Sequence, residues 1–116
     1  MITFHAGFVA VSLATREIVI KLIMKMAAER RLAQTIYLQS FAHAADKVFE
    51  IVVDYLSEVK DGYVRAACYR ALMFSKKDYY FPQEEDLYSA NIELRISATK
   101  YLGKLPSKKP LICLVK

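Results

Sequence analysis

The residues of this chain that could support catalysis or metal binding are few and stand apart from one another. A catalytic or metal role needs several donors that meet in space, and the sequence indicates no such group around His5; His43 has Asp46 and Lys47 at helical spacing, but these three residues fit the first turn of a helix. Cys68 and Cys113 belong to no CxxC or Cys/His spacing, so the sequence indicates neither zinc nor a redox dithiol. We therefore predict no metal, no cofactor and no catalytic residue.

Motifs that would identify an enzyme are also missing from the sequence. It contains no nucleophile elbow, no phosphate-binding glycine loop and no dinucleotide fingerprint. The acidic run at 84–86 follows Pro82, and acids in a first helical turn are explained by the helix dipole alone. We expect a protein that is not an enzyme and has no small-molecule substrate.

Binding chemistry is better represented, first of all by three consecutive aromatic residues. Tyr79, Tyr80 and Phe81 stand beside Lys76 and Lys77 in a predicted loop. Aromatic rings beside lysines can anchor a protein partner or stack on nucleic-acid bases. The other interpretation is that these rings fold back and fill the groove between helices. Both interpretations stay open at this point.

The second binding feature is the charge of the C-terminal part. Residues 94–116 contain six bases and no acid, whereas residues 41–93 contain six bases and ten acids. Basic side chains that neutralise phosphates bind nucleic acid electrostatically, although a solvated basic face has the same composition. As an alternative function, the sequence therefore indicates nucleic-acid binding. The residues that would contribute are Lys100, Lys104, Lys108 and Lys109.

Length and composition indicate which elements must position these side chains. The chain has 116 residues, of which only three are glycine and three are proline. One domain spanning 1–116 fits this length, and so few turn-forming residues favour helices over strands. The apolar N-terminal stretch is too short to span a membrane. The predicted fold class is all-α.

Hydrophobic spacing predicts three helices in the first two thirds of the chain. They run over 12–38, over 40–59 with Ser40 as N-cap, and from the cap residue Asp61 to about 75. In the third helix, small and apolar residues including Cys68 form the buried stripe, and Arg65 points away from it. Because a buried thiol is typical of reducing compartments, we expect a cytoplasmic protein.

A further helical stretch begins after Pro82 and ends at Gly103. Asn91 either divides this stretch into two helices or lies inside one long helix. The remaining residues, 104–116, carry two prolines and are predicted to form an extended C-terminal tail.

An internal repeat is the most specific pattern in the chain. Residues 64–72 align without gaps to residues 94–102, and six of the nine paired positions keep their chemical type. The pairs are Val64 with Leu94, Arg65 with Arg95, Ala67 with Ser97, Cys68 with Ala98, Arg70 with Lys100 and Leu72 with Leu102. A capping residue precedes each copy, Asp61 in one and Asn91 in the other. This pattern resembles the second helix of a HEAT repeat, over about 41–103.

The HEAT-like resemblance implies a short stack of antiparallel helix pairs, and a small helical bundle is the alternative fold. It also implies that Arg65 and Arg95 reach the capping residues Asp61 and Asn91, and that the chain is a protein-interaction or scaffold module. The apolar stretches 1–13 and 111–115 indicate end caps, or surfaces for docking or self-association. The predicted partner-binding residues are Tyr79, Tyr80, Phe81, Arg65 and Arg95.

Overall fold

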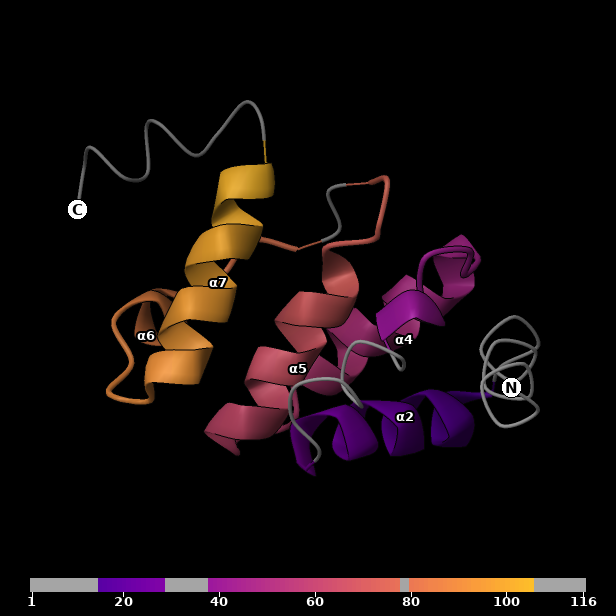
Figure 1. Cartoon of the computed structure of the whole chain (residues 1–116), viewed down its shortest axis with the longest axis horizontal. Coiled ribbons are helices and arrows are strands. Elements are labelled where there is room, and N and C mark those ends of the chain that lie inside the picture. Colours follow the sequence, from indigo (N-terminus) through magenta and orange to yellow (C-terminus); the bar gives the residue numbers. More distant parts are fainter. Residues whose placement is uncertain (1–14, 29–37, 78–79, 106–116) are drawn as a thin grey trace.

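The computed structural model describes residues 15–28, 38–77 and 80–105, and all the regular elements in these residues are helices. The predicted all-α class is therefore confirmed. None of the helices that the structure describes combines the length and the apolar character needed to span a membrane. The helices are α2 (Arg16–Ala28), α4 (Asp46–Leu56), α5 (Gly62–Leu72), α6 (Glu84–Leu87) and α7 (Ile92–Lys104) (Figure 1).

Two of the predicted helix starts are confirmed by their caps. The Asp61 carboxylate accepts hydrogen bonds from the backbone amides of Tyr63, at 2.9 Å, and Val64, at 3.1 Å, and so caps α5. The Asn91 side chain accepts one from the amide of Leu94, at 3.2 Å. Asn91 therefore divides the last helical stretch into α6 and α7, and α7 continues one residue beyond Gly103.

The predicted start of the second helix is wrong. Ser40 is buried in a turn, and α4 begins at Asp46 after Ala45, whose side chain makes no capping hydrogen bond. The physical reason lies in Phe41, which is fully buried with its ring 6.4 Å from that of Phe49. In a continuous helix these two residues would be about 12 Å apart along the axis, so the chain must turn to bring the rings together.

Helix α5 lies at the centre of the domain, between α7 on one side and α2 and α4 on the other (Figure 1). Helices α4 and α5 are antiparallel, because Asp46 at the start of α4 forms an ion pair with Lys77 beyond the end of α5, at 2.9 Å. Helices α5 and α7 are parallel, because Gly62 lies beside Asn91 where both begin and Tyr69 lies beside Tyr101 further along, with ring centroids 5.7 Å apart. Arg16 at the start of α2 pairs with Glu58, just beyond the end of α4, at 2.7 Å.

Small side chains allow α5 to be surrounded in this way. Ala66, Ala67, Cys68 and Ala71 are all fully buried, so neighbouring helices approach the α5 backbone closely on several sides. The prediction that Cys68 belongs to the buried stripe is confirmed. Large apolar residues from α2 and α4, such as Ile23 and Leu56 among others, fill the remaining core volume.

Candidate functional site

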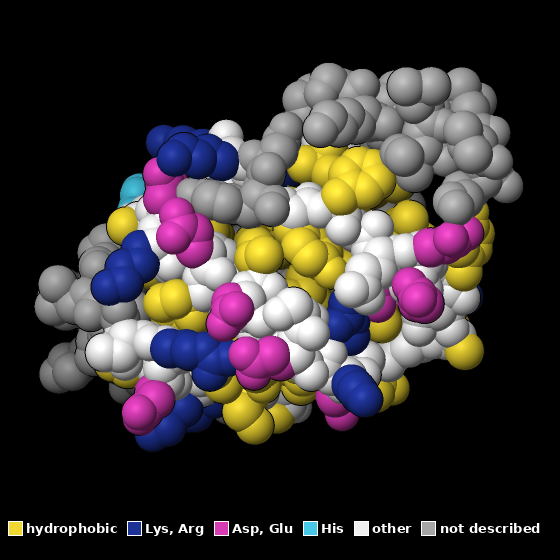
Figure 2. Space-filling view, turned by 180° about the vertical axis from the view of Figure 1, so that it is seen from behind, with side chains coloured by type: hydrophobic (Ala, Val, Ile, Leu, Met, Phe, Trp, Pro, Cys, Tyr) yellow, Lys and Arg dark blue, Asp and Glu magenta, His cyan; other side chains and the backbone are white. Residues whose placement is uncertain are grey.

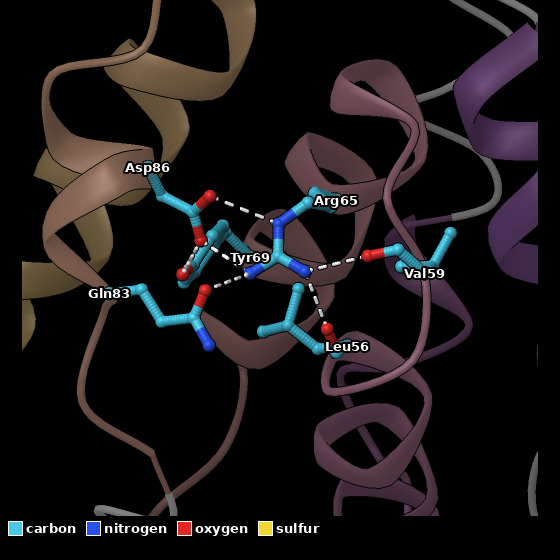
Figure 3. A network of polar contacts seen from close by, with 6 residues as sticks. All are labelled: Leu56, Val59, Arg65, Tyr69, Gln83 and Asp86. Atoms are coloured by element: carbon cyan, nitrogen blue, oxygen red, sulfur yellow. Dashed lines mark hydrogen bonds and ion pairs between the residues drawn. The ribbon is translucent and has the colours of Figure 1, made fainter.

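The most elaborate polar arrangement among the described residues is centred on Arg65, in the first turn of α5 (Figure 3). Its guanidinium donates two parallel hydrogen bonds to the Asp86 carboxylate, from Nε to Oδ1 at 3.0 Å and from Nη2 to Oδ2 at 2.6 Å. This two-pronged geometry is the strongest pairing that arginine makes with a carboxylate. Both side chains are buried, with 9% and 5% of their surface exposed.

The remaining donors of Arg65 tie α5 to two other helices. Nη1 donates to the carbonyl oxygens of Leu56, at 2.6 Å, and Val59, at 2.7 Å. Leu56 is the last residue of α4, where carbonyl groups have no partner within the helix. Nη2 also donates to the side chain of Gln83, the N-cap residue of α6, at 3.2 Å. One side chain thus joins the end of α4, the start of α5 and the start of α6.

Tyr69 completes this network by donating its hydroxyl hydrogen to Asp86 Oδ2. Burial and this hydrogen bond raise the pKa of Tyr69 well above its ordinary value. Burial alone would lower the pKa of Arg65, but the hydrogen bonds and charge of Asp86 outweigh it and raise that pKa above the ordinary range. Both groups therefore keep their protons at neutral pH, and their chemistry here is to hold helices together.

Two sequence expectations for Arg65 need correction. It points into the fold and not away from the buried stripe, since only 8% of the residue is exposed. Its side chain binds Asp86, Gln83 and two backbone carbonyls and not a capping residue of either repeat copy. Arg95, its counterpart in the second copy, is exposed and donates to the backbone carbonyl of Ser89 at 3.0 Å, which is likewise no capping side chain.

The aromatic residues of the predicted loop do not form an exposed platform where the structure describes them. Tyr80 is half-buried, with its ring 6.1 Å from that of Tyr69, and its carbonyl accepts a hydrogen bond from the Tyr101 hydroxyl at 2.9 Å. Phe81 is also half-buried against the core. These two residues fit the interpretation in which the rings fill the space between helices. Tyr79 lies outside the described residues.

Of the four lysines predicted to bind nucleic acid, two lie within the described residues. Lys100 is exposed on α7. The Lys104 ammonium lies over the Tyr101 ring, 5.7 Å from its centroid, in the geometry of a cation–π contact. Lys108 and Lys109, together with the apolar stretches 1–13 and 111–115, lie outside the described residues.

Sequence reasoning missed a group of exposed apolar side chains around the start of α5 and α7. Tyr63, Tyr88, Ile92 and Ile96 are 44%, 62%, 59% and 48% exposed. The first three lie near the place where the starts of α5 and α7 meet, because Gly62 contacts Asn91 there, and Ile96 follows one turn along α7. The sequence held a signal for two of them: Ile92 and Ile96 are four residues apart and outside the stripe that contains Leu94 and Ala98.

Two other surface features are a group of hydrophobic side chains and an open pocket. Figure 2 shows hydrophobic side chains gathered in the middle of one face of the molecule, with charged side chains of both signs around them. An open pocket of about 410 Å³ lies at the start of α4, bounded by Phe49, Phe74, His43 and Lys76 among others. Asp46, which also lines it, already pairs with Lys77. Within the described parts of the chain, no three His, Cys, Asp or Glu side chains are grouped so as to hold a metal ion.

Comparison with protein-family models, with curated protein sequences and with solved structures gave no match. What is shown is a small all-helical domain with five described helices. Any inference about function must therefore come from the contacts and surfaces of this chain.

Proposed function

We propose that this chain is a non-enzymatic protein-interaction or scaffold module built on HEAT-like helix pairs. The helix directions support the repeat part of this proposal. An antiparallel pair, α4 and α5, is followed by the shorter α6 and by α7, and α7 lies parallel to α5. Stacked helix pairs place their second helices side by side in this way. The second pair is abbreviated, because α6 has only four residues.

The observation that carries the interaction proposal is the exposure of Tyr63, Tyr88, Ile92 and Ile96 around the paired helix starts. Exposed apolar side chains mark a binding site when they form one contiguous patch, and the meeting of the starts of α5 and α7 brings these residues near one another. Tyrosine is also favoured where binding energy is concentrated. In contrast, the buried Arg65, Tyr69 and Asp86 bind one another and so serve the fold.

One observation favours the alternative function, nucleic-acid binding. Arg95 and Lys100 are exposed on α7, and neither forms an ion pair with an acid in the part of the chain that the structure describes. Both belong to the basic segment 94–116. The apolar side chains on the same helix favour a protein partner, since nucleic-acid backbones offer no apolar surface in return.

Selection of short random peptides displayed on phage, with the full chain immobilised, tests the proposed function. We expect enrichment of peptides that bind the chain in solution and keep most of their affinity when the salt concentration is raised. In parallel, single-stranded and double-stranded DNA and RNA are tested by gel mobility shift. Absence of any enriched peptide, together with nucleic-acid binding that weakens steeply with salt, would support the alternative and overturn the proposal.

A further inference from the structure

Helix α7 presents an apolar stripe on the side that faces away from the core. We define the α7 outer face as Ile92, Ile96, Thr99 and Gly103, which are all exposed. Their spacing of four, three and four residues places them in one line along the helix. The buried residues Leu94 and Ala98 lie on the opposite side, where α7 packs on α5 and α6. Neither α5 nor α6, the described helices against which α7 packs, therefore covers the stripe.

The charges that flank this stripe on α7 itself are positive. Arg95 and Lys100 are exposed beside it and form no ion pair within the described residues. Glu93, the single acid of α7, is half-buried and pairs with Arg70 at 2.8 Å, so its charge is already neutralised. The α7 outer face therefore combines an apolar centre with basic flanks.

We propose that the α7 outer face binds an acidic amphipathic helix of another protein, an inference that rests on the proposed interaction function. Such a helix has leucine or isoleucine along one line and Asp or Glu on both sides of it, which matches the centre and the flanks of the face. From Ile92 to Gly103 the face is about 16 Å long, which corresponds to about three turns of a bound helix. The small residues Thr99 and Gly103 let its backbone approach closely at one end.

The chain itself does not offer this complement in its described residues. Helix α4 has an acidic outer side, but there Asp46, Glu50 and Asp54 occupy the centre of the side and leave no apolar line. Asp46 is also paired with Lys77, and Asp54 with Arg16 at 3.4 Å. Two α7 outer faces would bring Arg95 and Lys100 of both copies together, and like charges oppose such contact.

An anionic lipid surface would also attract the basic flanks of the α7 outer face. Membrane-surface helices bury a wide apolar side, and their binding strength grows with the apolar area that enters the lipid. Here only Ile92 and Ile96 are large, because Thr99 and Gly103 follow them along the stripe. The geometry therefore favours a narrow protein helix over a lipid surface.

Fluorescence anisotropy with a synthetic probe tests the proposal. The probe is a labelled helical peptide with leucines along one line and glutamates at its flanks, and the control peptide has lysines in place of the glutamates. We expect the acidic probe to bind and the basic control not to bind. Ile92→Asp with Ile96→Asp should weaken probe binding at least about tenfold, because central apolar contacts are lost and the new carboxylates repel the acidic probe. Arg95→Glu with Lys100→Glu should weaken it similarly.

A matched variant on another helix separates this site from apolar surface in general. Ile18 and Met24 on α2 are 37% and 51% exposed, so Ile18→Asp with Met24→Asp changes a comparable surface and should leave probe binding unchanged. Circular dichroism checks that every variant keeps its helices. A probe that fails to bind, or that binds the α7 variants as tightly as the parent chain, overturns the proposal.

The remaining outcomes separate this proposal from the proposed function. If phage-selected peptides bind but the α7 substitutions leave their affinity unchanged, the α7 site is wrong and the interaction function stands. If neither probe nor selected peptide binds, both are wrong. Sedimentation with vesicles of phosphatidylcholine and phosphatidylserine adds a last comparison. Vesicle binding that depends on Ile92 and Ile96, without probe binding, would replace the protein partner by a lipid surface.

Discussion

At the scale of single residues, the buried ion pair of Arg65 and Asp86 is the centre of the polar network. Removing two charges from water is costly, and the attraction between them offsets that cost only when geometry and additional hydrogen bonds are good. Here the guanidinium also donates to Leu56, Val59 and Gln83, and Tyr69 donates to the carboxylate. Removal of either charge would leave the other one buried without compensation.

The substitution Asp86→Asn removes the carboxylate charge and keeps the shape of the side chain nearly unchanged. It therefore tests how far stability depends on this ion pair. We expect the free energy of unfolding to fall by about 3–5 kcal/mol, because Arg65 keeps its charge in a buried site. Urea unfolding followed by circular dichroism measures it, and a variant that is unfolded in buffer also meets the expectation. Glu85→Gln, at an exposed position of α6, is the control and should change stability by less than about 0.5 kcal/mol. Equal small effects of both substitutions would contradict the account.

Cys68 gives a prediction for alkaline pH. Burial raises the pKa of its thiol from 9.0 to about 12, so the folded protein holds this proton more tightly than the unfolded chain does. Stability from this group is fully present below pH 9 and is lost as pH rises from 9 toward 12. Over that range, Cys68→Ala should reduce the pH dependence of the unfolding free energy by up to about 1.4 kcal/mol per pH unit.

Denaturant unfolding of parent and Cys68→Ala chains at several alkaline pH values provides this comparison. The slopes with pH are compared and not the absolute stabilities, because the substitution also removes a fully buried atom from the core. Tyr69, whose pKa is also raised by burial, is present in both chains and contributes equally. Parallel slopes would show that the thiol is not held in its neutral form.

At the scale of helices, sequence predicted features that depend on neighbouring residues and missed those that depend on distant ones. Asp61 and Asn91 could be identified as caps because a cap acts within three residues. The start of α4 could not, since it depends on how Phe41 packs against Phe49. Asp86 looked like an ordinary acid of a first helical turn, and its partner Arg65 is 21 residues away. A contact between residues so far apart in the sequence depends on how the helices pack.

The two glycines of the described helices should respond in opposite ways to alanine. A Cβ at Gly62 would lie 2.6 Å from Asn91 Nδ2 and 3.2 Å from Asn91 Cγ, whereas a Cβ at Gly103 would meet nothing within 4 Å. We expect Gly103→Ala to stabilise the domain by about 0.5–1 kcal/mol, because alanine favours helix. Gly62→Ala should destabilise it by about 1–3 kcal/mol, because Asn91 cannot move freely while it caps α7. Thermal or urea unfolding measures both changes.

A second substitution identifies the cause at Gly62. Asn91→Ser keeps a capping side chain and shortens it, so it removes the closest atom, Nδ2, and puts the smaller Oγ in place of Cγ. The double variant Gly62→Ala with Asn91→Ser should be more stable than the sum of the two single effects predicts. Stabilisation by Gly62→Ala alone would contradict the close approach of α5 and α7 at this end.

At the scale of the whole molecule, some polar side chains lie in the core and some large apolar side chains lie on the surface. An arginine and an aspartate lie inside, whereas Ile92 and Ile96 lie outside on α7. The sequence predicted an all-α interaction module and assigned partner binding to Arg65, Arg95 and the aromatic loop, of which only Arg95 lies beside the α7 outer face. Helical spacing separates the two sides of α7 but does not show which side other helices cover. The sequence therefore could not show which of these surfaces stays exposed for a partner.

The most direct test of the central claim is a nuclear magnetic resonance titration of the isoleucine methyl groups of the intact chain. A phage-selected peptide is added to protein with labelled isoleucines, and each methyl signal is followed. We expect the signals of Ile92 and Ile96 to shift, while those of exposed Ile18 and buried Ile23 stay in place. A shift of Ile18 with Ile92 and Ile96 unmoved would contradict it and would place the contact surface on α2.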